Sequence, residues 1–125
     1  MKLVLDAGAL IGIDRSDRRT AALIELGRRA GAELITAAPV LAQAWRDGAR
    51  QAVLAKSLPM IDIRPTSVDD AKRAGTLLAK AGSSDVVDAF VALLVAPHDQ
   101  VLTSDADDIR TLLNARPITA TIVRV

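Results

Sequence analysis

The stretch KLVLDAGALIGID at residues 2–14 determines the fold, because an apolar run that ends in an acid leads directly into a helical segment. Lys2 to Leu5 has the length and composition of a buried β-strand, and Ala7 to Ile13 is predicted to be a short helix or turn. The change from strand to helix recurs along the chain. We therefore expect an α/β fold with a mainly parallel sheet.

Beyond this stretch, the sequence predicts four further strands, at 33–36, 60–63, 100–103 and 119–123. The remaining helices are predicted at 17–30, from Pro39 through Trp45, and at about 49–56, 67–81, 84–96 and 104–113. Ser67 and Asp70 have the spacing of a capping box. Apolar side chains share one face of the helix over 17–30 (Ala22, Leu23, Leu26 and Ala30) and mark the inner face of the helix after Ser67 (Val68, Ala71, Gly75, Leu78 and Ala81).

The composition limits both the core and the chemistry. The chain has 125 residues, which predicts a single domain over 1–125. It is 50% hydrophobic but only 2% aromatic, so the core is expected to be aliphatic. The absence of cysteine and the single histidine, His98, exclude a disulfide scaffold, a cysteine nucleophile and a Cys-rich or multi-histidine metal site. Glu25 and Glu33 are the only glutamates, so aspartate oxygens are the available hard-metal ligands.

Charge and hydropathy indicate the compartment. The formal net charge of +1 does not predict general binding to polyanions, although it allows a local basic patch. Asp6 interrupts the apolar N-terminal run, which therefore does not resemble a secretory signal. The longest apolar stretch, at about 86–96, is too short to span a bilayer. We expect a soluble cytoplasmic protein with no membrane contact.

Carboxylates fall where a parallel sheet places its functional site. Asp6 ends the first strand, Asp105 follows the fourth, and Asp85 and Asp88 lie in the first turn of the helix over 84–96. Sites in parallel sheets form outside the carboxyl ends of the strands. Asp88 is the most informative of the four, because VVDAFVALLVA at 86–96 is otherwise apolar, and burying a charge is expensive unless it is paired or bound to metal.

Each acid alone also has a structural explanation. Asp85 and Asp105 could cap helices, and Asp6 could be a turn residue. Together, three acids at one sheet edge would repel one another, and a divalent cation would remove that repulsion. Mg²⁺ prefers carboxylate and water ligands, and such a site can activate water and stabilise the leaving group of a phosphodiester.

Four stretches in order resemble a known family: VLDAGALI at 4–11, TAAPVLAQAWR at 36–46, DVVDAFVALL at 85–94 and LTSDADDI at 102–109. Over essentially the whole chain, they resemble the PIN domains of VapC-type toxin ribonucleases from toxin–antitoxin pairs. The resemblance implies a three-layer α/β/α fold with a central sheet of about five strands. It also implies RNA hydrolysis at an Asp-lined Mg²⁺ or Mn²⁺ site, inhibition by a cognate antitoxin, and a homodimer.

The resemblance assigns roles to individual residues. Asp6, Asp88 and Asp105 match the acids that bind metal and carry catalysis, and Asp85 is a neighbouring candidate ligand. Thr103 and Ser104 match the hydroxyl-bearing turn that supports such a site, and Asp107 is a candidate outer acid. The family usually has a glutamate at the position of Gln43, whose amide brings no charge. An alternative is therefore a weakened or inactive scaffold that binds RNA or a protein partner.

Other residues leave further alternatives open. The basic side chains near these motifs could contact RNA phosphates or belong to a solvated surface. Trp45 is expected in the core or at a subunit interface rather than as a stacking platform. A response-regulator receiver would need a lysine near the last strands, and none follows Lys80; a haloacid-dehalogenase phosphatase would need an acid where Gly8 stands. The candidate RNA-contacting residues are Arg15, Arg18, Arg19 and Arg46.

Overall fold

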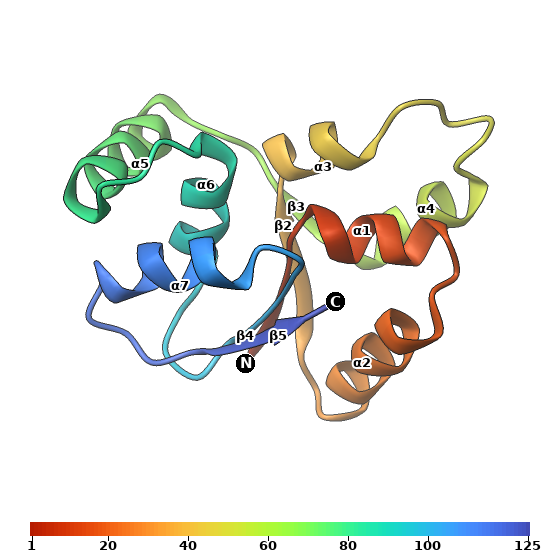
Figure 1. The fold of residues 1–125 in the computed structure, drawn as a ribbon. Coiled ribbons are helices and arrows are strands. Elements are labelled where there is room, and N and C mark those ends of the chain that lie inside the picture. Colours follow the sequence, from red (N-terminus) through yellow and green to blue (C-terminus); the bar gives the residue numbers. More distant parts are fainter.

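The strands form one all-parallel sheet in the order β3-β2-β1-β4-β5 (Figure 1). The computed structural model describes residues 1–125. The strands are β1 (Lys2–Leu5), β2 (Glu33–Ala37), β3 (Asp62–Arg64), β4 (Gln100–Thr103) and β5 (Thr121–Arg124). All five predicted strands are present, and the α/β class is confirmed. β3 begins later than expected because Leu58–Met60 forms a 3-10 turn before it.

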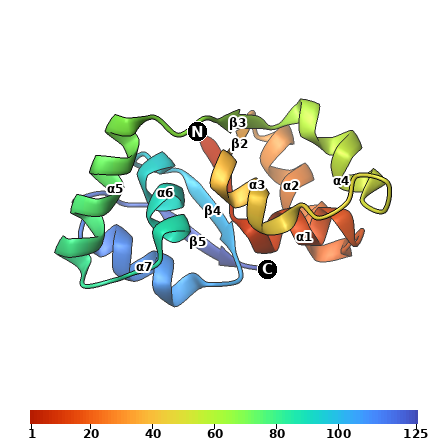
Figure 2. The same cartoon turned by 90° about the horizontal axis from the view of Figure 1, so that it is seen from above.

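Helices cover both faces of the sheet and complete three layers (Figures 1 and 2). On one face lie α1 (Ala7–Asp14), α2 (Arg18–Arg29) and α4 (Ala52–Ser57), and on the other lie α5 (Val68–Ala81), α6 (Val86–Leu94) and α7 (Ala106–Asn114). α3 (Ala38–Ala44) follows β2 directly and packs against both α1 and α6. The longest helix, α5, has 14 residues. None of the helices is both long and apolar enough to cross a membrane.

The core is aliphatic, as the composition predicts. Its main cluster holds 21 buried residues, all of them Ala, Leu, Val or Ile. The central strand β1 contributes Leu3, Val4 and Leu5, which helices cover from both sides. The two aromatic residues, Trp45 and Phe90, are half-buried and pack against this cluster. Trp45 ends α3, and its indole ring lies so close to Gly48 that a Cβ there would be 2.9 Å from the ring atom Cζ2.

The predicted apolar face of α2 is wrong. Leu26 is 64% exposed, whereas Thr20 and Gly27 are buried and Leu23 is half-buried. Thr20 can be buried because its hydroxyl donates a 2.8 Å hydrogen bond to Asp17, the N-cap residue of α2. Small and locally satisfied side chains therefore form the contact face, and apolar periodicity does not reveal them.

The predicted inner face of α5 is confirmed at Leu78 and Ala81, which pack against the core, and is wrong in the first half of the helix. The capping box of Ser67 and Asp70 is confirmed. However, Val68 is 74% exposed, and the buried residues are Ala74 and Leu77. The actual contact stripe consists of residues 74, 77, 78 and 81, which follow the i, i+3, i+4, i+7 spacing of one helix face.

Two glycines provide a matched test of packing. A Cβ on Gly12 would lie 2.5 Å from the Oγ1 atom of buried Thr20, so Gly12→Ala would push α1 and α2 apart. Gly75 is exposed in the middle of α5 with nothing within 4 Å of its Cβ position. We expect Gly12→Ala to lower the free energy of unfolding by about 1–3 kcal/mol and Gly75→Ala to raise it by about 0.5–1 kcal/mol. Urea unfolding measures both, and a Gly12→Ala variant as stable as the parent would contradict this packing.

Candidate metal centre

The candidate site lies where the carboxyl ends of β1 and β4 meet. These two strands are neighbours in the sheet, and Leu5 is in register with Leu102. The chain does not pass directly from β1 to β4, however. After β1 it first forms β2, which pairs with the opposite side of β1. Such a reversal of strand order leaves a crevice at the sheet edge, where ligands of α/β proteins bind. Asp6 follows β1 immediately, and Asp105 follows β4 by two residues.

Asp6 is held by hydrogen bonds to both of its carboxylate oxygens. The side chain is 2% exposed. Its Oδ1 accepts a 2.8 Å hydrogen bond from the backbone N–H of Ala7, and its Oδ2 accepts a 2.6 Å hydrogen bond from the hydroxyl of Thr103. The same hydroxyl accepts a 2.9 Å hydrogen bond from the backbone N–H of Asp105. Thr103 therefore links the ends of the two central strands.

Asp88 approaches Asp6 from the helix layer and lacks a partner. It lies in the first turn of α6, where Asp85 caps the helix by accepting a 3.0 Å hydrogen bond from the Asp88 N–H. The residue is 3% exposed, and its Oδ2 is the one buried side-chain polar atom of the chain without a hydrogen bond. Buried polar groups in folded proteins are nearly always satisfied, so an orphaned carboxylate oxygen needs an explanation.

Asp99 shows what a satisfied buried acid looks like in this chain. At the opposite sheet edge, its carboxylate accepts hydrogen bonds from the N–H groups of Lys2 and Ala96, both at 2.8 Å, and pairs with the Lys2 ammonium. Burial acts to raise the pKa of Asp99, but these bonds outweigh burial and hold the pKa below its usual value. No sequence pattern singled out this acid. Its role is structural, and Asp88 has no comparable support.

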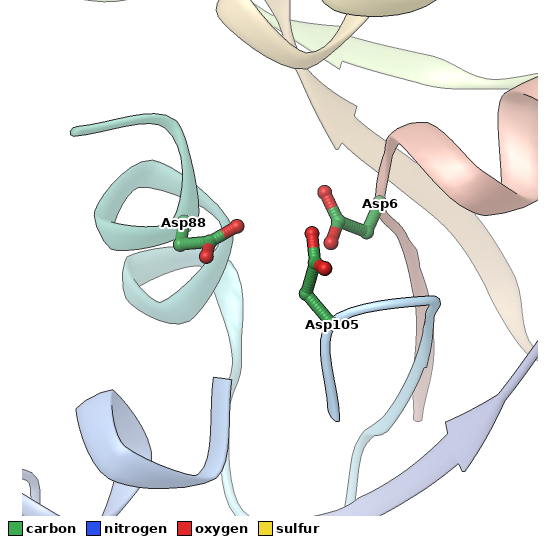
Figure 3. A group of neighbouring side chains, drawn as sticks. All are labelled: Asp6, Asp88 and Asp105. Atoms are coloured by element: carbon green, nitrogen blue, oxygen red, sulfur yellow. The ribbon is translucent and has the colours of Figure 1, made fainter. Parts of the chain in front are cut away.

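Asp105 completes the cluster. It occupies the N-cap position of α7 but makes no capping hydrogen bond, so the helix-cap explanation for this residue is wrong. Its exposed carboxylate instead points toward Asp6 and Asp88 (Figure 3). One oxygen from each of the three carboxylates lies within 4.8 Å of the others. The three acids therefore converge from β1, α6 and the β4–α7 turn.

The proximity of the carboxylates changes their titration. Burial, together with the negative charges of Asp6, Asp85 and Asp105, raises the pKa of Asp88 to about 7. Burial also raises the pKa of Asp6, against the opposing effect of the hydrogen bond from Thr103. No lysine or arginine forms an ion pair with any of the three clustered acids.

This donor set fits a hard divalent cation. All three side chains offer oxygen, the ligand atom that Mg²⁺ and Mn²⁺ prefer. The orphaned Oδ2 of Asp88 has no hydrogen-bond donor in the chain and would gain a partner from such an ion. A cation would also offset the repulsion that raises the pKa of Asp88.

Three other predicted site residues, Asp85, Ser104 and Asp107, contribute no oxygen to the cluster. Asp85 is the N-cap of α6 and acts on the cluster through its charge. Ser104 packs against Gly8, where a Cβ would lie 2.5 Å from its hydroxyl oxygen; nothing in the sequence signalled this contact. Asp107 is exposed and forms ion pairs with Arg110 and Arg124 at 3.3 Å and 3.0 Å.

Gln43 lies in the last turn of α3, the helix that packs between α1 and α6. Its side chain is exposed and has no hydrogen-bond partner in the chain.

The four candidate RNA-contacting arginines are all exposed. Arg19 donates to the backbone carbonyl of Arg124, and Arg46 donates to the carbonyls of Ala42 and Trp45 at the end of α3. Arg15 and Arg18 make no side-chain hydrogen bond or ion pair. The structure therefore leaves two of the four guanidinium groups without a partner in the chain.

Comparison with known proteins gives no independent assignment. No protein-family model matches the chain, and no curated protein matches it. The chemistry of the site therefore rests on its own geometry.

The stability of the chain should report the unusual titration of Asp88. The folded chain keeps this proton up to about pH 7, whereas the carboxyl group ordinarily releases it near pH 3.8. Between these values the unfolded chain loses the proton first, so rising pH destabilises the fold by on the order of a few kcal/mol at this residue. We expect Asp88→Asn, measured in EDTA by thermal unfolding, to have a higher Tm than the parent above pH 7, with a gain that shrinks toward pH 4.

Asp62→Asn is the matched control for this measurement, because Asp62 is exposed on the edge strand β3 and belongs to a surface ion pair. It should give no pH-dependent gain in Tm. An Asp88→Asn gain of the same size at pH 4 and pH 8 would mean that Asp88 titrates normally.

The bridging hydroxyl of Thr103 can be tested separately. Thr103→Val keeps the shape of the side chain but leaves Asp6 Oδ2 and the Asp105 N–H without partners. We expect the free energy of unfolding to fall by about 1–3 kcal/mol and Mn²⁺ affinity to fall by about 10–100-fold. Urea unfolding and calorimetric Mn²⁺ titration measure these changes. Thr103→Ser retains the hydroxyl and is the control; equal Mn²⁺ affinity in the two variants would show that the bridge does not support the site.

Proposed function

We propose that the chain is a metal-dependent endoribonuclease of the PIN-domain, VapC-like kind. The observation that carries the proposal is the convergence of Asp6, Asp88 and Asp105 within 4.8 Å around a buried carboxylate oxygen that has no partner. Three carboxylates from separate segments, with no cation to balance them, are arranged for metal binding rather than for stability.

Different residues of the chain would have different roles at such a site. Asp6, Asp88 and Asp105 would hold Mg²⁺ or Mn²⁺, which when bound supplies a Lewis acid that activates water and offsets charge on a phosphodiester. The Thr103 hydroxyl orients Asp6, and the backbone N–H of Asp105 orients Thr103 in turn. Asp105 is the exposed member of the cluster, so its side of the site is open to a substrate.

Two features support RNA as the substrate. The donor set contains only carboxylates, which suits hydrolysis of a phosphodiester with no protein nucleophile. Three of the four motifs carry the cluster, and all four follow the order seen in toxin ribonucleases, whose catalytic acids Asp6, Asp88 and Asp105 resemble in position. On the same grounds we propose a cytoplasmic homodimer that a cognate antitoxin inhibits.

A second candidate function follows from Gln43. An uncharged and exposed amide stands on α3, at the position where the resemblance implies a fourth acid. A site with one charge fewer binds a divalent cation more weakly. The alternative is therefore a PIN-like scaffold that binds RNA or a protein partner and cuts slowly or not at all.

Cleavage of a labelled single-stranded RNA in Mg²⁺ or Mn²⁺ tests both functions. We expect Asp6→Asn to lower the cleavage rate by about 100-fold or more, because a charged ligand contributes several kcal/mol to such chemistry. Asp62→Asn, which removes an exposed acid outside the cluster, should cut at the parent rate. Gln43→Glu should bind Mn²⁺ more tightly than the parent and cut at least as fast.

The outcomes separate the two candidates. If the parent does not cut RNA and Gln43→Glu does, the result supports the second candidate, a PIN-like scaffold with a weakened metal site. If neither the parent nor Gln43→Glu cuts RNA in either metal, the ribonuclease proposal is wrong.

A further inference from the structure

A basic cavity lies on the outer side of the α5–α6–α7 layer. It has a volume of about 430 Å³ and is formed by α5, the end of α6 and the segment 115–118. Lys72, Arg73 and Lys80 line it from α5, and Arg116 lines it from the turn after α7. No acidic residue lines the cavity. Four positive charges therefore face a single hollow.

None of these four residues forms an ion pair, although seven other basic residues of the chain do. The acid nearest in sequence, Asp70, is held in the capping box with Ser67 at the start of α5. Unpaired like charges in one cavity repel one another, and an anionic ligand would remove that repulsion. No acid lines the cavity itself, although the charge of Asp70 at the start of α5 acts on Arg73.

Arg116 is fixed in position by the end of α6. Its Nη1 donates hydrogen bonds to the carbonyl oxygens of Ala92 and Val95, the latter at 2.8 Å. Burial and the positive charge of Arg73 lower its pKa. A guanidinium has five N–H donors, so donors remain for a ligand after these two bonds are made. Arg116 is therefore a pre-oriented anion-binding group, not a freely moving surface side chain.

The distance between the two lysines suits an extended ligand that carries several negative charges in a row. Lys72 and Lys80 are eight residues apart on α5, about 12 Å along its axis, and both line the cavity. A single small anion cannot contact both ends of this row, whereas successive phosphates of a nucleic-acid strand can. Leu77, Leu93 and Ile118 add apolar surface between the charges, against which sugar and base edges could pack.

One end of this row of charges lies near the carboxylate cluster in the chain. Lys80 lies in the last turn of α5, and five residues later Asp85 caps α6, whose first turn carries Asp88. α5 and α6 lie side by side, joined by this short loop (Figure 2). A strand held along α5 would leave the helix at its carboxyl end, where the chain turns into the helix that carries Asp88.

We propose that this cavity binds the phosphodiester backbone of a single RNA strand on its way to or from the carboxylate cluster. The inference rests on the proposed function, since it assigns the path of the substrate at the same site. Phosphate contacts of this kind position a strand and carry no base specificity. The cavity would therefore set the reach and orientation of the RNA, not the sequence that is cut.

Fluorescence anisotropy of a labelled single-stranded RNA in EDTA tests this binding without cleavage. We expect the double variant Lys72→Gln/Lys80→Gln to bind roughly tenfold more weakly at moderate salt and to lower the slope of log affinity against log salt by about 1.4, or about 0.7 for each phosphate that the variant no longer neutralises. Both lysines are exposed, so the fold should be retained. The matched control compares two single variants. Lys80→Gln removes a lysine from the cavity, and Lys56→Gln removes an exposed and unpaired lysine from α4, away from the cavity.

An unchanged salt slope in the double variant would overturn the inference, as would an equal loss of affinity in Lys56→Gln. An oligoglutamate peptide that binds as tightly as RNA, and weakens in the same double variant, would assign the cavity to an acidic protein segment and also overturn it. Inorganic phosphate that displaces RNA at equal concentration would assign it to a small anion instead.

Cleavage distinguishes the two proposals. If the parent cuts RNA and the double variant binds RNA as tightly as the parent does, only the inference about the cavity is wrong. Weaker binding in the double variant, with no cutting by the parent or by Gln43→Glu, supports the inference and removes the ribonuclease proposal.

Discussion

The hydroxyl of Thr103 is the contact on which the geometry of the site depends. Parallel pairing brings the carboxyl ends of β1 and β4 together, but pairing alone does not orient the side chains that follow them. Thr103 does so by donating to Asp6 and accepting from the backbone of Asp105, all within a region closed to solvent on the Asp6 side. One buried side chain thus sets the positions of two acids that are 99 residues apart in the chain.

The position of Asp88 reflects a conflict between stability and chemistry. α6 is nearly all apolar because it is packed between the sheet and the helices α5 and α7. Asp88 enters this layer with one oxygen unsatisfied, while Asp99 at the other edge has a full set of partners. A chain selected only for stability would place an apolar residue at position 88. Retaining such a group is typical of functional sites, where strain and repulsion are tolerated for binding.

Strong local signals made much of the fold and part of the site predictable. Apolar runs ending at Asp6 and Thr103 marked the central strands, and a lone charge in the 86–96 stretch singled out Asp88. The contact face of α2 was not predictable, because Thr20 and Gly27 take positions that apolar periodicity does not mark. The face of α5 was predicted correctly only at Leu78 and Ala81. The basic cavity could not be predicted either, since Arg116 joins residues of α5 only through tertiary packing.

The nearly aromatic-free composition has a spectroscopic consequence. Trp45 is the only tryptophan and the chain has no tyrosine, so one indole ring accounts for almost all intrinsic emission. That ring ends α3, two residues after Gln43, and rests on Gly48 instead of lying in the aliphatic centre. Its fluorescence therefore reports on the α3–α4 segment beside the carboxylate edge, whereas circular dichroism reports on the helices as a whole. A fluorescence change that precedes the loss of the circular-dichroism signal would show that this segment loosens before the helices as a whole.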